Sequence, residues 1–332
     1  MSATSITAKA PVGSGTVDVR VTTTFGTSAT SAADQFTYAA PAGRTFVSAS
    51  TGVDSNTCTR DAPCLTFAAA LKSTSAGGEM DVLDPGDFGP VTLTGSITID
   101  GGGGLVAGVG VVPGTSGITI NAGADDVIIL RGLAFDGYGE TGASGVVFNS
   151  GSRLEIEQCT FQGFDTAGIA FTPGTGSATT AKMFVENSTM VGNAGGLLIK
   201  PTEGIAAAVT LIAVHIDQNS GSGLIADGTS GSGPIQVAMG DSSASFNASN
   251  GIDVTSAQAS VTVDVVRATI GANGLAGIQS QGGAASVTVG SSQIRGNATG
   301  LQSIGGGVLR SYANNQVTGN GSNGSFTTTG LQ

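Results

Sequence analysis

The sequence predicts an all-β chain that winds as a single-stranded parallel β-helix of about nine rungs. Three observations predict this fold. One short phrase recurs between Lys182 and Phe326, each copy holds runs in which apolar and polar residues alternate, and the composition favours strands and turns. Runs such as VTVDVV from Val261 have the period of a strand with one buried face, and no copy has the apolar spacing of an amphipathic helix. The repeating unit is therefore one rung of strands joined by tight turns.

An asparagine anchors each copy of the phrase. A period in the mid-twenties suits one rung of a β-helix, whereas a propeller blade needs roughly 40 to 50 residues. A leucine-rich repeat would carry an L-x-x-L-x-L phrase and a helical return segment, which this sequence lacks. The anchors, with successive gaps of 26, 28, 26, 24 and 23 residues by subtraction, are Asn193, Asn219, Asn247, Asn273, Asn297 and Asn320.

These asparagines are predicted to be structural. Asparagine tolerates the left-handed backbone conformation of a tight turn better than most residues, and identical amides stacked from rung to rung can hydrogen-bond along the axis. The repeat thus predicts an Asn ladder at one corner, made of turn-formers and not of ligand-binding groups.

The composition excludes two classes of partner. The chain has 332 residues with 55 Gly, no Trp and only 11% charged residues, and the scarce Lys and Arg are scattered. Nucleic-acid binding needs clustered cations, and the formal charge of −11 argues against it. No stretch of about 18 apolar residues occurs, so we expect no membrane span.

Residues 1–41 are predicted to form a separate piece. Strands surround a turn at Phe25, and the phrases GTVDVRV and DQFTY resemble the last strands of an IPT/TIG domain, an immunoglobulin-like β-sandwich of secreted and cell-surface proteins. Half a sandwich leaves an apolar face uncovered. We expect that the chain begins inside a longer protein, the alternative being completion by another chain. No signal peptide follows Met1.

Residues 44–96 contain the one convincing helix. It is expected to begin near Pro63 or Thr66 and to stop at Gly77 and Gly78, before a strand from Met80 to Leu83. The phrases TFVSASTGVDSNTC, PCLTFAAAL and MDVLDPGDFGPV resemble the entry to right-handed β-helix proteins of the pectate-lyase-like superfamily. That resemblance implies a right-handed coil whose first rung is capped by this helix.

Two cysteines flank this entry. A disulfide between Cys58 and Cys64 would close a loop of seven residues and suit an exported protein; free thiols are the alternative. A zinc site lacks further ligands nearby, since the single histidine, His215, is more than 150 positions away. The third cysteine, Cys159, aligns with Ser188 of the next rung and is expected to be a small buried residue.

Residues 97–332 are assigned to the β-helix. Insertions after Gly137 and after Phe171 are the expected projecting loops, which in solenoids often make contacts. At about 4.8 Å per rung, nine rungs give a rod on the order of 40 Å long.

The superfamily resemblance directs attention to acidic residues. Its lyases use an acidic calcium cluster beside an arginine, and Asp125 and Asp126 lie near Arg131 in sequence, although both acids are expected to be turn-formers. Its hydrolases use a His-Gly phrase, whereas His215 precedes an isoleucine and is expected to face solvent. The entry-turn acids Asp81, Asp84 and Asp87 could bind calcium, but their spacing does not demand it.

No other catalytic pattern is visible in the sequence. No serine or cysteine is paired with a base, and the glycine run from Gly101 leads into no helix that could cradle phosphate. We therefore predict no catalytic, cofactor-binding or metal-binding residue. Tyr138, in its loop, is the one candidate for stacking on a sugar.

Three functions follow as hypotheses, in this order. The first is a non-catalytic extracellular or cell-surface module that acts as a rigid spacer, adhesin or appendage subunit. The second is a polysaccharide-active lyase or hydrolase, and the third is a phage tail-spike or fibre. The candidate partners are carbohydrate, other surface proteins, and further copies of the chain joined head to tail into filaments, because the two ends of the chain are unlike surfaces.

Overall fold

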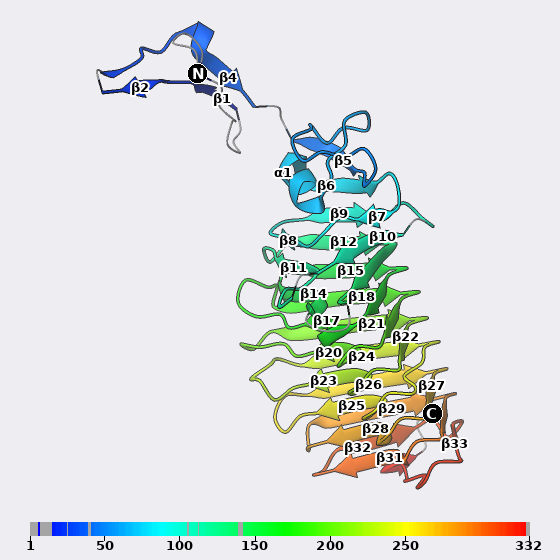
Figure 1. Ribbon diagram of the computed structural model, residues 1–332. Coiled ribbons are helices and arrows are strands. Elements are labelled where there is room, and N and C mark those ends of the chain that lie inside the picture. Colours follow the sequence, from blue (N-terminus) through cyan, green and yellow to red (C-terminus); the bar gives the residue numbers. More distant parts are fainter. Residues whose placement is uncertain are drawn as a thin grey trace.

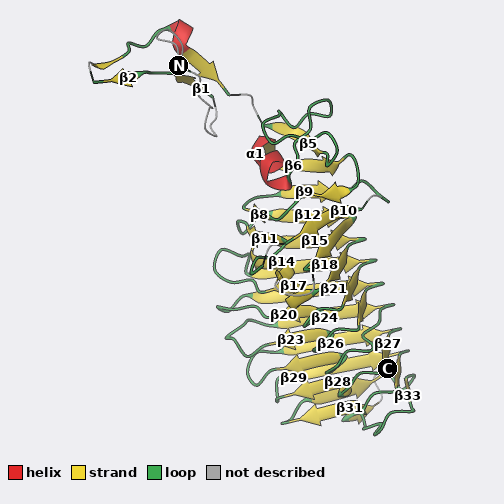
Figure 2. Ribbon diagram, viewed as in Figure 1, coloured by secondary structure: helices red, strands yellow, loops and turns green. Residues whose placement is uncertain are grey.

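The computed structural model describes residues 6, 15–24, 26–38, 41–104, 106–111, 113–138 and 142–329. Figure 1 shows a rod of stacked strands that begins at a short helix, α1 (Phe67–Ser73), with the amino-terminal strands ahead of it. Figure 2 shows strands throughout the rod. The all-β fold class predicted from the repeat is confirmed.

Three parallel sheets make the walls of the rod, and most turns of the chain add one strand to each wall. Sheet 1, with 12 strands, consists of β5 (Ala42–Val47), β6 (Thr74–Val82), β9 (Ile97–Asp100), β12 (Val127–Arg131), β15 (Arg153–Glu157), β18 (Thr180–Glu186), β21 (Ala206–Ile212), β24 (Ile235–Gly240), β26 (Val261–Val266), β29 (Ala285–Gly290), β32 (Val308–Ser311) and β34 (Thr328–Thr329).

Sheet 2 has the shortest strands and is interrupted once, where Ser243 alone bridges β22 and β27. Its strands are β7 (Gly86–Asp87), β10 (Ala107–Gly110), β13 (Leu133–Asp136), β16 (Thr160–Gln162), β19 (Thr189–Val191), β22 (His215–Asp217), β27 (Thr269–Gly271), β30 (Gln293–Arg295) and β33 (Gln316–Val317).

Sheet 3, with nine strands, follows sheet 2 in every turn. Its strands are β8 (Val91–Leu93), β11 (Ile118–Asn121), β14 (Gly142–Ser150), β17 (Phe164–Phe171), β20 (Leu197–Ile199), β23 (Leu224–Asp227), β25 (Ile252–Thr255), β28 (Ala276–Gln281) and β31 (Thr299–Ile304).

Eight complete turns run from β9 to β31, and β32 with β33 adds a partial one. This agrees with the expected count of about nine rungs, the last of which has no strand in sheet 3.

The core fills the interior of the coil. Strand residues alternate between the inner and outer faces, so the inward positions of successive turns stack. The rings of Phe135 and Phe161 stack with their centroids 4.6 Å apart, and those of Phe148 and Phe171 lie 4.8 Å apart. All four rings are buried, and aliphatic residues take the same positions in later turns.

The six anchor asparagines form a column at the corner between sheets 2 and 3. Each side-chain Nδ2 donates to Oδ1 of the next asparagine, at 3.2, 2.9, 3.1, 2.8 and 2.9 Å from the first pair to the last. Each Nδ2 also donates to a backbone carbonyl, as Asn219 does to Met190 O at 3.2 Å. The first five side chains are buried, so the column satisfies polar groups that would otherwise lack partners.

The expected reason for asparagine at this corner was wrong in one respect. The left-handed residue is the one just before each anchor, as in Gln218 with φ 58° and Ala272 with φ 55°, and not the asparagine itself. Asparagine is used because its amide both donates and accepts within the buried column.

The glycine three or four positions after each anchor is required by packing. A Cβ atom added to Gly251 would lie 2.7 Å from Asn273 Nδ2 and 2.7 Å from Gly277 O. Glycine therefore allows successive turns to approach closely enough for the amides to bond.

The corner between sheets 1 and 2 has a second column. The hydroxyl of Ser188 accepts from Cys159 N at 3.1 Å, and that of Ser292 accepts from Ala268 N at 3.1 Å. Cys159 takes the place of the serine in its own turn and is buried, as expected from the alignment with Ser188. Burial raises the pKa of the Cys159 thiol to about 12.

Helix α1 caps the first turn. Thr66 is its N-cap, with Oγ1 accepting from Ala69 N at 3.1 Å, and the buried Phe67 ring packs 5.3 Å from that of Phe88. The helix ends at Ser73, earlier than the predicted stop at Gly77. Thr74 is already extended and donates its hydroxyl to Ala70 O, so β6 begins there.

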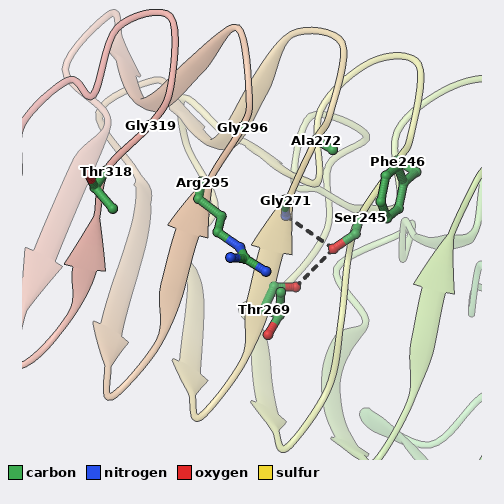
Figure 3. A pocket seen from close by; sticks show the side chains of 9 residues that line it. All are labelled: Ser245, Phe246, Thr269, Gly271, Ala272, Arg295, Gly296, Thr318 and Gly319. Carbon is green, nitrogen blue, oxygen red and sulfur yellow. Dashed lines mark hydrogen bonds between the residues drawn. The ribbon is translucent and has the colours of Figure 1, made fainter.

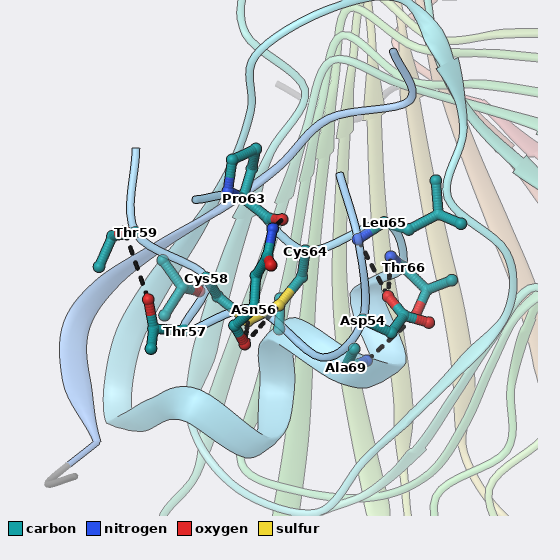
Figure 4. Close-up of a disulfide and its surroundings, with 12 residues drawn as sticks. Asp54, Asn56, Thr57, Cys58, Thr59, Pro63, Cys64, Leu65, Thr66 and Ala69 are labelled. Atoms are coloured by element: carbon teal, nitrogen blue, oxygen red, sulfur yellow. Dashed lines mark hydrogen bonds between the residues drawn. A yellow bond between two sulfur atoms is a disulfide. The ribbon is translucent and has the colours of Figure 1, made fainter. Parts of the chain in front are cut away.

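Cys58 and Cys64 form a disulfide beside this cap, and both are buried (Figure 4). Phe46 N donates to Cys58 O at 2.8 Å, and Ser48 N donates to Cys64 O at 2.9 Å. The disulfide loop is thereby attached to β5, the edge strand of sheet 1.

Ahead of the rod, β1 (Thr16–Asp18) pairs antiparallel with β4 (Gln35–Thr37), and β2 (Thr22–Thr23) pairs with β3 (Gly26–Thr27). A 3-10 helix, η1 (Ala32–Asp34), precedes β4. The predicted turn residue Phe25 lies outside the described residues. Four apolar side chains here are more than two-fifths exposed: Val17, Val19, Val21 and Phe36.

Candidate functional site

The outer face of sheet 2 carries the polar and small side chains of nine short strands. The register aligns Asp136 with Gln162 at one end, and Gly271 with Arg295 at the other. This face holds two separate hollows, one toward each end. It concentrates exposed polar groups and two exposed aromatic rings, and we treat it as the candidate site.

A hollow of about 440 Å³ lies in the carboxyl-terminal half of this face (Figure 3). Phe246 and Arg295 are its largest side chains. Gly271 forms part of its floor, where Ser245 Oγ accepts from Gly271 N at 3.1 Å and donates to Thr269 O at 3.3 Å. Among the described residues the Arg295 guanidinium has no hydrogen bond or ion pair, so it is free to bind an external group.

Phe246 is the one large apolar residue at its corner position among the described turns. Its φ is 58°, in the left-handed region that bulky residues rarely adopt, and its side chain is 64% exposed. At the same corner position other turns have Gly192, Gln218, Ala272 and similar residues. The left-handed backbone is therefore the ordinary geometry of this corner, and the exposed apolar ring is what distinguishes Phe246 as a contact for a ligand or partner.

His215 faces solvent, as expected, but it has partners that the sequence did not reveal. Its Nδ1 lies 2.9 Å from Ser243 Oγ, and Ser243 donates to Asp217 Oδ2 at 2.7 Å. Asp217 Oδ1 also accepts from Ser245 N at 2.7 Å. The expectation that no serine has a base beside it was therefore wrong.

This cluster does not have the order of a nucleophilic triad. Asp217 binds the serine hydroxyl, and its Oδ2 lies 4.0 Å from His215 Nδ1, so it does not orient the imidazole as a catalytic aspartate would. Its clear role is structural, because Asp217 bonds the turn where sheet 2 is interrupted. The exposed imidazole remains available to hydrogen-bond a ligand.

The acids proposed for a lyase-like calcium site are not brought together with arginine. Asp126 accepts from Ser96 Oγ at 2.7 Å and Gly123 N at 2.8 Å, and the Ser96 hydrogen bond lowers its pKa. Arg131 instead pairs with Glu157 at 3.0 Å on the outer face of sheet 1. Asp125 is exposed in the turn, so both acids occupy turn positions, as expected.

The three entry-turn acids have separate partners. Asp81 pairs with Arg44, Asp84 accepts from Ala49 N at 2.6 Å, and Asp87 accepts from Gly110 N at 2.9 Å. Within the described ranges no group of three His, Cys, Asp or Glu side chains is placed to hold a metal ion.

Tyr138, the predicted stacking residue, is 64% exposed. Its hydroxyl donates to Asp87 Oδ2 at 3.1 Å, and the charge of Asp87 raises the pKa of Tyr138. It lies on sheet 2, like the Phe246 hollow, but near the opposite end.

Sequence reasoning missed Phe246 and Arg295. One signal was present: aligned on the anchor asparagines, the residue before the anchor is Gly, Gln or Ala in other turns and Phe only at 246. Arg295 gave no comparable signal, because its role in the hollow depends on which residues of neighbouring turns lie beside it in the folded coil.

No helix among the described residues is long and apolar enough to cross a membrane. The family model described as right handed beta helix region matches residues 144–322, more than half of the chain. Among solved structures, that of pectate lyase Pel9A is 16% identical with a TM-score of 0.57, covering 81% of this chain and 74% of its own. A rhamnogalacturonan lyase is 11% identical with a TM-score of 0.55, covering 76% and 74%.

No curated protein sequence matches the chain. At these identities the two structures share the fold with this protein and do not establish its activity. The parallel coil, the stacked corners and the family match agree, and the chain belongs to the right-handed β-helix family.

Proposed function

We propose that this chain is a non-catalytic, extracellular β-helix module that binds polysaccharide along the outer face of sheet 2. The observation that carries the proposal is that the exposed Phe246 ring and the unpaired guanidinium of Arg295 line one hollow, with Gly271 between their turns. An aromatic face packs against the apolar side of a sugar ring, while a guanidinium binds its oxygens. The disulfide of Cys58 and Cys64 suits an oxidising compartment.

A binding panel tests the proposal. Immobilised neutral and acidic polysaccharides are titrated with wild type, Phe246→Ala, Arg295→Gln and the control Tyr312→Ala, whose ring lies outside this hollow and is 43% exposed. We expect at least one polysaccharide to bind, with about tenfold weaker binding by each hollow variant and unchanged binding by the control. Wild type that binds nothing, or hollow variants that bind like wild type, would refute the proposal.

A polysaccharide-active enzyme is the second candidate. It is favoured by the exposed His215 imidazole on the same face as the unpaired Arg295, and it gains support from the likeness to two lyases. Prolonged incubation with the polysaccharides that bind, with and without calcium, should yield new reducing ends or unsaturated products if the chain is an enzyme. Absence of both products removes this candidate.

The amino-terminal strands fit the same surface role. We propose that they are the last strands of an IPT/TIG-like sandwich within a multidomain protein, on the support of their sequence phrases and the exposed Val17 and Phe36. Head-to-tail association into filaments would also cover that face. Electron microscopy and sizing of concentrated protein test the second arrangement, which a monomer at all concentrations contradicts.

A further inference from the structure

A second hollow lies near the amino-terminal end of sheet 2, around Tyr138. It has a volume of about 460 Å³ and is separate from the Phe246 hollow. Along the sheet, Asp136 of this hollow and Ser245 of the other occupy equivalent positions four turns apart, which at about 4.8 Å per turn places these two residues about 19 Å from each other along the rod.

Tyr138 is held in place by its surroundings. Its hydroxyl donates to Asp87 Oδ2 at 3.1 Å, and its backbone N–H donates to Asp136 Oδ1 at 2.7 Å. The residue has a φ of 54°, so its exposed ring, like that of Phe246, stands on a left-handed backbone. A side chain on Gly110 would collide with Tyr138 Oη, so only glycine there lets the ring lie across β10.

This arrangement fixes the ring before any ligand arrives. A tethered ring loses less freedom on binding than a mobile one, which favours affinity. The hydrogen bond to Asp87 also leaves the Tyr138 oxygen able to accept from a ligand hydroxyl.

The polar groups around the ring have unused hydrogen-bonding capacity. Gln162 Nε2 donates to Asp136 Oδ2 at 2.9 Å, which leaves the Gln162 carbonyl oxygen and a second N–H free. Carboxylate oxygens accept more than one hydrogen bond, so Asp136 can also receive sugar hydroxyls. Thr160 adds a hydroxyl to the rim.

The charge of the hollow selects among sugars. Two carboxylates, Asp87 and Asp136, line it, and among the described residues its lining includes no Lys, Arg or His side chain. A sugar that carries a carboxylate would be repelled here, whereas uncharged hydroxyl groups would donate to both acids. The Phe246 hollow has the opposite character, because its charged side chain is Arg295.

We propose that the Tyr138 hollow binds an uncharged pyranose unit, with the apolar face of the sugar on the Tyr138 ring and its hydroxyls donating to Asp136 and Asp87. This inference rests on the proposed polysaccharide-binding function and adds a second subsite with a defined sugar class. The two subsites lie on one face, so one polysaccharide chain running along the rod can reach both.

Binding to galactomannan, dextran and polygalacturonate tests the inference, using wild type, Tyr138→Ala, Tyr138→Phe, Asp136→Asn and Phe246→Ala. Far-ultraviolet circular dichroism and the urea midpoint establish that each variant is folded. We expect wild type to bind a neutral probe, Tyr138→Ala to bind it about tenfold more weakly, and Tyr138→Phe, which keeps the ring, to lose less. Asp136→Asn should weaken the neutral probe and not the acidic one.

The outcomes separate this inference from the proposed function. Binding of polygalacturonate alone, or neutral binding that Tyr138→Ala leaves unchanged while Phe246→Ala reduces it, overturns the inference and leaves the function standing. If wild type binds none of the three probes, the inference is overturned as well. If wild type also binds no polysaccharide of the full panel, the proposed function is overturned.

Discussion

Asn219 donates its side-chain Nδ2 to Oδ1 of Asn247 at 2.9 Å, and Asn247 repeats the contact with Asn273 at 3.1 Å. Both amides are also bonded to backbone groups of the preceding turn. The column therefore joins the turns of the coil through buried polar contacts that have few substitutes.

Asn247→Ala should be strongly destabilising. The change leaves Asn219 N and Ile216 O without the partners they have at 3.0 Å, and both lie in the interior. Each unsatisfied group costs about 1–3 kcal/mol, so we expect the free energy of unfolding to fall by about 2–6 kcal/mol in urea titrations. Asn320→Ala, at the half-buried end of the column, is the control and should cost about 1 kcal/mol. Equal losses would contradict the account.

Gly251→Ala should disrupt the same corner by crowding it. The added methyl would lie 2.7 Å from Asn273 Nδ2 and 2.8 Å from Ile270 Cγ2, so a neighbour must move. We expect a loss of about 1–3 kcal/mol in the free energy of unfolding. In Gly192→Ala the methyl meets open space, and the cost of about 1 kcal/mol comes from its φ of 68°. A larger loss at Gly192 would reverse the expectation.

Reduction of the Cys58–Cys64 disulfide should lower stability modestly. The loop it closes is short, and loop entropy predicts a loss of about 2 kcal/mol. The measurement is the urea midpoint with and without dithiothreitol. A variant with both cysteines changed to alanine is the control, and its midpoint should not respond to the reductant. If the midpoint of that variant fell by a similar amount in dithiothreitol, the loss of stability in wild type would not come from reduction of this disulfide.

Cys159 should be unreactive in the folded protein. Burial raises the pKa of its thiol to about 12, so at pH 8 almost no thiolate is present and no reagent can reach it. Iodoacetamide should label it only in urea, as mass spectrometry can show. Cys159→Ser should change stability by about 1 kcal/mol or less, because serine occupies this corner in other turns, as at Ser188 and Ser292. Rapid labelling of native protein would contradict its burial.

Acid should weaken the region around Asp126. The Ser96 hydroxyl lowers the pKa of Asp126 in the folded state, so the carboxylate contributes stability that is fully present above its unfolded value of about 3.9. That contribution is lost as the pH falls through the lower, folded pKa. Wild type should therefore lose more free energy of unfolding between pH 6 and pH 3 than Asp126→Asn. Asp125→Asn, at the exposed neighbour, should behave like wild type, and parallel pH profiles for all three proteins would refute the assignment.

The fold was predictable because one residue type, asparagine, recurs with the period of the repeat. An inward amide such as Asn219 recurs at the same corner of six successive turns, so its spacing reports the length of a turn directly. The end of α1 was not predictable from Gly77, because Thr74 is already extended and pairs with Ala42 of β5. Its hydroxyl donates to Ala70 O and accepts from Thr45 Oγ1 at 2.7 Å.

The candidate site was only partly predictable. Tyr138 was visible as a loop aromatic, but its contact with Asp87 joins residues 51 positions apart. Ser243 and His215 are 28 positions apart and meet only because sheet 2 aligns their turns. Side chains on an outer face follow no sequence period. Which of them are neighbours is therefore known only from the folded coil.

The uneven spacing of the anchors, from 23 to 28 residues, has a consequence for how such rods change over evolutionary time. The extra residues are absorbed where the chain crosses from sheet 3 to sheet 1, while the amide corner keeps its column. The connections from sheet 3 to sheet 1 can therefore gain or lose residues from one turn to the next without disturbing the column of asparagines.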